Sequence, residues 1–167
     1  AAKSIDAHLS SRWEERDITP ASCADELTVL RRLSLALCGT VPSLEEIRRF
    51  EADGGPDRLE RWTAAMLEDN RYINYFAERL ARAYVGVEGG QFITFRRDRF
   101  TEWLRQQLRE HRPYDAMVAD MLTGSGVWTG EGEVNFVTAA FANEEIDHNK
   151  LTARTVRAFL GQRIDCA

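Results

Sequence analysis

Apolar residues recur at three- or four-residue intervals along nearly the whole chain, and this spacing places them on one side of an α-helix. Ile5, Leu9 and Trp13 give the first example, and Tyr72, Phe76 and Leu80 lie within a later, aromatic one. The periodicity predicts an all-α protein. We expect a single irregular helical bundle of about eight or nine helices, interrupted by two glycine-rich loops.

Helix-ending signals agree with this periodicity. Gly39 and Gly161 each follow an apolar stripe. We expect each to end its helix, because the residue just after a helix is often a glycine in the left-handed backbone conformation. Ser43 and Glu46 have the spacing of a capping box, and Ser22 is the expected N-cap of the preceding helix. The apolar patterns of the predicted helices cover about residues 5–13, 27–37, 44–50, 57–66, 71–85, 97–110, 114–122, 136–143 and 150–160.

The length of 167 residues fits one globular domain, and no composition shift marks a boundary. We therefore predict one helical domain over residues 1–167 and expect it to be a fragment of a longer chain. Residues 86–95 and 124–133 are the two glycine-rich loops. Phe92, Phe95 and Trp128 lie in them, and these rings either stack on a sugar ring or fold back onto the core.

The charge pattern disfavours nucleic acid as a partner. The formal net charge is −5, and the basic residues alternate with Glu and Asp along the predicted helices. That alternation is typical of solvated helix faces with paired charges, whereas nucleic-acid binders gather basic residues on one face. The sequence also contains no uninterrupted apolar run of about 18 residues, so we expect no membrane span.

Motifs for metal or nucleotide chemistry are weak. Glu145 and His148 form the single Glu-x-x-His pair, but a helical di-metal site needs a second such pair. A charged helix start is the simpler interpretation. The sequence contains no P-loop, no H-E-x-x-H and no G-x-S-x-G, and we predict no metal site.

The three cysteines have different surroundings. Cys23 and Cys38 bracket a predicted helix, which would separate them by about 22 Å and prevent a disulfide. Cys38 is expected to be a small buried apolar residue. Cys166 follows the last predicted helix and is next to the end of the sequence.

Four segments together resemble a known family. They are RRLSLALCGTVPSLEEI at 31–47, DNRYINYFAERLARAYVG at 69–86, HRPYDAMVADMLTG at 111–124 and RAFLGQRIDCA at 157–167. In this order they resemble the planctomycete-type cytochrome-associated domain, a PSCyt-type family of unknown function. The chain is similar to it as a divergent member, because the family usually has Asp, Thr and Leu-Pro-Pro at Ala36, Cys38 and positions 40–42.

The resemblance implies a function for Cys166. In that family the run ending in Cys-Ala continues into a C-x-x-C-H haem-attachment sequence, so Cys166 would be the first thioether cysteine. The alternative is a terminal cysteine without this role. The resemblance implies haem c in the full-length protein, none bound by this fragment, and an extracytoplasmic location in the periplasm or at the cell surface. Its partners would be other domains of the parent chain and a redox protein.

Two further functions stay open. The chain could be a non-redox helical interaction or scaffold domain of cell-surface polysaccharide-degrading machinery. It could also be a hydrolase or oxidase whose site lies in the two glycine-rich loops, and the sequence identifies no catalytic residue for such an enzyme.

Overall fold

The computed structural model of the chain describes residues 2–89, 93–127 and 129–164. This part of the chain is dominated by helices, and its strands are two two-residue segments paired in a hairpin. The predicted all-α class is confirmed. The elements are α1 (Ala2–Glu14), α2 (Glu26–Cys38), α3 (Leu44–Ala52), α4 (Arg58–Leu67), α5 (Asn70–Val85), α6 (Arg97–Arg109), α7 (Tyr114–Thr123), the 3₁₀ turn η1 (Gly132–Val134), α8 (Asn135–Thr138), β1 (Phe141–Ala142), β2 (Glu145–Ile146), α9 (His148–Thr155) and the π-helical turn η2 (Val156–Leu160).

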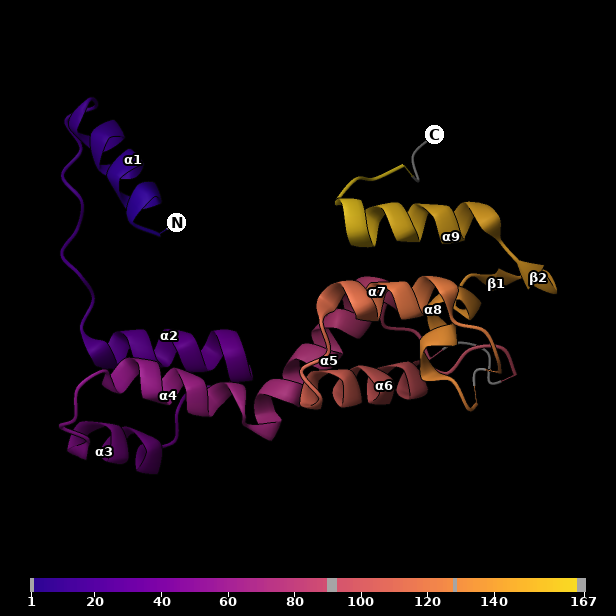
Figure 1. Cartoon of the computed structure of the whole chain (residues 1–167), viewed down its shortest axis with the longest axis horizontal. Coiled ribbons are helices and arrows are strands. Elements are labelled where there is room, and N and C mark those ends of the chain that lie inside the picture. The colour runs from indigo at the N-terminus through magenta and orange to yellow at the C-terminus, as the bar shows by residue number, and fades with distance from the viewer. Residues whose placement is uncertain (1, 90–92, 128, 165–167) are drawn as a thin grey trace.

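Helix α5 joins two groups of helices (Figure 1). One group contains α2, α3 and α4, and the other contains α6 to α9 with the hairpin. Helix α1 stands away from both groups at the end of an extended segment. Its apolar stripe is correspondingly open to solvent, since Ile5 is 60% and Leu9 39% exposed. The predicted helix therefore forms, but its apolar face covers no core.

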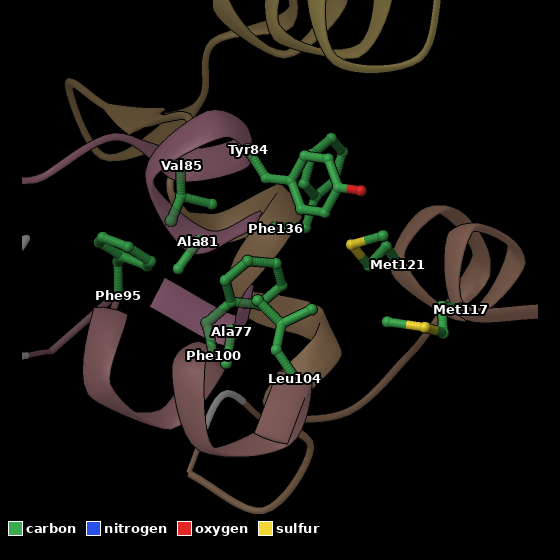
Figure 2. Close-up of a cluster of buried hydrophobic side chains, with 10 residues drawn as sticks. All are labelled: Ala77, Ala81, Tyr84, Val85, Phe95, Phe100, Leu104, Met117, Met121 and Phe136. Atoms are coloured by element: carbon green, nitrogen blue, oxygen red, sulfur yellow. The ribbon is translucent and has the colours of Figure 1, made fainter. Parts of the chain in front are cut away.

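The larger hydrophobic cluster lies where α5 packs against α6, α7 and α8 (Figure 2). Ala77 and Ala81 are fully buried and let α6 approach α5 closely, while Phe100 and Phe136 fill the space beside them. The most buried positions of α5 are thus small residues, whereas Tyr72, Tyr75 and Phe76 are only half-buried. The cluster is Ala77, Ala81, Tyr84, Val85, Phe95, Phe100, Leu104, Met117, Met121 and Phe136.

A smaller cluster holds α2, α3 and α4 together. Leu30, Cys38, Phe50 and Met66 form it, and Trp62 packs against Phe50 with its ring nearly perpendicular at 5.5 Å between centroids. Burial raises the pKa of the Cys38 thiol, which keeps it protonated. Cys23 is exposed and both thiols are free, so the predictions for these two cysteines are confirmed.

The helix ends largely follow the local signals. Gly39 and Gly161 both have the left-handed conformation expected of them, with φ of 72° and 66°. The Ser43–Glu46 capping box forms with both of its hydrogen bonds. The prediction of Ser22 as the N-cap of α2 is wrong, because the Asp25 carboxylate accepts the Thr28 N–H at 2.8 Å and α2 begins after it.

The prediction of a helix over residues 136–143 is also wrong. Helix α8 ends at Thr138, and the chain then turns back as a hairpin in which Phe141 pairs with Ile146. Asn143 and Glu144 at its tip both have positive φ, the pattern of a type I′ turn that fits the twist of a two-residue hairpin.

The last helical stretch begins two residues earlier than predicted, at His148, and continues through the π-helical turn η2 to Leu160.

Within the described ranges, no helix combines the length and the apolar character that crossing a bilayer requires.

Candidate functional site

The residues singled out from the sequence do not converge on one site. Cys166, Phe92 and Trp128 lie outside the described residues. Phe95 is only 6% exposed and belongs to the larger hydrophobic cluster, so its ring is not available to stack on a sugar. Of the two interpretations of that ring, folding back onto the core is the correct one.

The Glu-x-x-His pair is split between two elements. Glu145 lies on β2, His148 is the first residue of α9, and Asp147 between them caps α9 by accepting the Lys150 N–H at 3.0 Å. The charged helix start is therefore confirmed for Asp147. Among the residues that the structure describes, no group of three or more His, Cys, Asp or Glu side chains is arranged to hold a metal ion.

The segment that leads toward Cys166 is anchored to the larger cluster. The Phe159 ring lies 5.5 Å from the rings of both Tyr84 and Phe136, measured between centroids. Arg154 on α9 donates to the carbonyl oxygens of Phe136 at 3.2 Å and Ala139 at 3.0 Å. Burial, followed by the nearby charge of Arg157, lowers the pKa of Arg154. The segment is thus held by aromatic packing and by hydrogen bonds to the carbonyls of Phe136 and Ala139.

A cavity of about 380 Å³ lies among α2, α3, α4 and the start of α5. Its floor is apolar, with Leu30 and Met66 buried in the smaller cluster and Trp62 packed against them. Its rim is charged. The lining residues are Leu30, Ser34, Pro42, Glu46, Arg49, Asp53, Arg61, Trp62, Ala65, Met66, Asp69 and Arg71.

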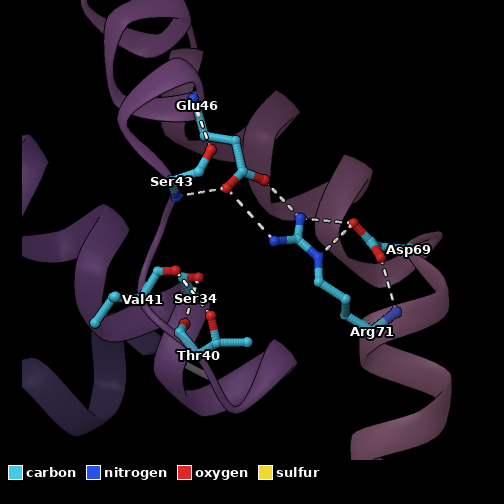
Figure 3. A network of polar contacts seen from close by, with 7 residues as sticks. All are labelled: Ser34, Thr40, Val41, Ser43, Glu46, Asp69 and Arg71. Carbon is cyan, nitrogen blue, oxygen red and sulfur yellow. Dashed lines mark hydrogen bonds and ion pairs between the residues drawn. The ribbon is translucent and has the colours of Figure 1, made fainter.

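Arg71 crosslinks two sides of this rim (Figure 3). From the first turn of α5 it donates to Glu46 of α3 at 2.5 Å and to Asp69 at 2.7 Å. Glu46 accepts in addition the Ser43 N–H at 2.7 Å, so one carboxylate serves both the capping box and the ion pair. Hydrogen bonds from Arg71 are the main reason that the pKa values of Glu46 and Asp69 are lowered.

Ser34 fixes the neighbouring wall. Its side chain is almost fully buried, and its hydroxyl donates to the Thr40 carbonyl at 2.7 Å (Figure 3). This bond fastens the turn that follows α2 to the helix itself. The same turn leads into Pro42 and into the capping box at the start of α3, and Pro42 and Glu46 both line the cavity.

Asp53 closes the opposite side of the rim. It accepts the Arg61 guanidinium at 2.6 and 2.7 Å, the Gly55 N–H at 3.1 Å and the Trp62 Nε1–H at 3.2 Å. The Arg61 hydrogen bond, then the Gly55 N–H, lower the pKa of Asp53. The hydrogen bond from Trp62 Nε1–H to Asp53 also fixes the orientation of the Trp62 indole.

These contacts decide which chemistry the rim can perform. All three carboxylates have lowered pKa values, so they are ionised at neutral pH and cannot act as general acids. Both oxygens of each carboxylate already accept at least one hydrogen bond from the protein.

Sequence reasoning did not find this cavity. Its residues come from four helices and the connections between them, and the local signal that marks Glu46 is that of the capping box with Ser43. The partner of Glu46 in space, Arg71, is 25 positions away. Nothing in the local spacing of either residue identifies the other.

The fold and the site define the class of protein: an irregular all-α domain with a charged-rim cavity and a C-terminal helix anchored beside an aromatic core. The chain belongs to the PSCyt2 family, described as a protein of unknown function (DUF1549), whose model matches residues 4–167. The family resemblance stated from the sequence is therefore confirmed. No curated protein and no solved structure matches the chain.

Proposed function

We propose that this chain is the helical module of a larger, exported, c-type-cytochrome-like redox protein and packs beside a haem-attachment segment that begins at Cys166. The observation that carries the proposal is the family match through residue 167, which includes the Cys-Ala step where the resemblance puts the first thioether cysteine. The family name PSCyt2 supports an association with cytochromes. Export is part of the proposal because the resemblance implies haem attachment outside the cytoplasm.

The anchoring of the preceding helix gives the proposal a physical basis. Phe159 fastens η2 to the larger cluster, and Arg154 ties α9 to α8. Leu160 and Ile164, by contrast, are 69% and 44% exposed. Because η2 is anchored to the cluster, the exposed apolar side chains at and after its end would offer the haem segment a surface to pack against.

The 167 residues of this chain do not by themselves provide an attachment site for haem c. Covalent attachment needs two thiols and an imidazole in a C-x-x-C-H sequence, and the 167 residues contain no such sequence. Among the described residues no cysteine and histidine cluster substitutes for it. We therefore assign this chain a positioning role only and derive no electron-transfer step.

The test begins with the residues encoded after Ala167. A cysteine three positions after Cys166, followed directly by histidine, is the expected result. The longer chain is then expressed in a host with c-type haem maturation, and haem that survives denaturing electrophoresis is measured together with the Soret band.

Two variants make this test specific. Cys166→Ala should abolish or strongly reduce covalent haem, whereas Cys23→Ala, which alters an exposed thiol far from the C-terminus, should not. Absence of the second cysteine and the histidine, or equal haem content in both variants, would refute the proposal. The scaffold function would then be the better interpretation.

A further inference from the structure

The charged-rim cavity among α2, α3 and α4 has the dimensions of a small-molecule site. Its volume of about 380 Å³ lies within the range that such pockets occupy. Five of its lining residues are apolar and seven are polar or charged, so a ligand that fills it needs both an apolar and a charged part. Trp62 supplies a flat ring, held in place by Phe50 and by its hydrogen bond to Asp53. The elements that line the cavity, α2, α3, α4 and the start of α5, lie apart from α9 (Figure 1).

The hydrogen bonds of the rim determine which ligand the cavity can accept. Its three acidic groups are already occupied, Glu46 and Asp69 by Arg71, and Asp53 by Arg61, Gly55 and Trp62. A cationic ligand would have to displace one of these partners. The rim thus offers a ligand no free carboxylate.

Arg49 is different from the other two arginines of the rim. It lines the cavity from α3 and lies over the Trp62 ring at 5.9 Å from the centroid, but no carboxylate of the described residues pairs with it. Its planar guanidinium therefore retains donors for an acceptor that enters the cavity. Arg49 is exposed, so an anion that enters the cavity can replace the water on this guanidinium without breaking an ion pair of the protein.

We propose that this cavity binds a small aromatic carboxylate, with its ring on the apolar floor beside Trp62 and its carboxylate on Arg49. A guanidinium matches a carboxylate because two parallel N–H groups can meet its two oxygens. The aromatic body is favoured by the ring of Trp62 and by the buried Leu30 and Met66 below it.

Phenylacetate is a suitable probe, and phenylacetamide is its uncharged match in shape. Binding is followed by isothermal titration calorimetry and by the indole N–H resonance of Trp62 in a two-dimensional NMR spectrum, assigned with a Trp62→Phe variant. We expect phenylacetate to shift this resonance in a saturable way and phenylacetamide to bind about tenfold or more weakly, because a charged hydrogen bond is lost.

Arg49→Gln should weaken phenylacetate binding about tenfold while leaving phenylacetamide binding unchanged. Arg48→Gln is the matched control, since it removes the same charge from the next position of α3, which is also exposed and does not line the cavity. Its affinity should equal that of the wild type, and circular dichroism checks that both variants fold. No saturable shift at about 10 mM phenylacetate, equal binding of the two probes, or equal effects of the two variants would each overturn the proposal.

Discussion

A methyl group added at Gly39 tests the close contact between the end of α2 and the Tyr75 ring of α5. Gly39 has φ 72° and ψ 7°, and a Cβ atom built there would lie 2.4 Å from Cδ2 of Tyr75. The left-handed conformation costs an alanine about 1 kcal/mol. Overpacking against a ring that cannot withdraw freely costs about 1–3 kcal/mol more. We therefore expect Gly39→Ala to lower the free energy of unfolding by about 2–4 kcal/mol.

Gly161→Ala separates the two contributions. Gly161 has nearly the same backbone angles, φ 66° and ψ 16°, but a Cβ atom there meets nothing within 4 Å. Gly161→Ala should therefore lower the free energy of unfolding only by the cost of the left-handed conformation, about 1 kcal/mol. Urea unfolding followed by helical circular dichroism measures both variants.

Gly39→Ala should cost less in a Tyr75→Ala background than in the wild type, because the ring that the methyl group meets is then gone, so the two substitutions should be less than additive. Equal losses in the two glycine variants, or full additivity with Tyr75→Ala, would refute the close contact between α2 and α5.

Three further predictions concern other features. Glu46 and Asp69 have lowered pKa values in the folded chain, so the stability they supply is present above about pH 4–5 and is lost as the pH falls. The difference in unfolding free energy between wild type and Arg71→Gln should therefore shrink on acidification, and a difference that grows would contradict the pairing. Burial raises the pKa of Cys38, so iodoacetamide at neutral pH should modify Cys23 first, and equal rates by peptide mapping would show that Cys38 is accessible. Deleting residues 1–24 should change the melting temperature by no more than about 2 °C, because α1 exposes its apolar stripe; a larger fall would mean that α1 packs on the body.

The Glu46 carboxylate illustrates how a local feature acquires a function in the tertiary structure. Its part in the capping box follows from spacing alone, since Ser43 and Glu46 are three positions apart on one turn. Its ion pair with Arg71 depends on the placement of α3 against α5 and joins two walls of the cavity. Losing Arg71 would therefore leave the cap in place and open the rim.

The sequence by itself determined the helical class, most helix positions and the ends of two helices, at Gly39 and Gly161. These features depend on interactions between residues three or four positions apart. It also indicated the family through four ordered segments. Only the tertiary structure decided that Phe95 is buried, that the apolar stripe of α1 is not, and that residues 141–146 form a hairpin. It alone assembled the cavity, whose rim residues come from separate helices and meet only when those helices pack. The reason is physical: a helix depends on near neighbours along the chain, whereas a site depends on contacts that packing brings together.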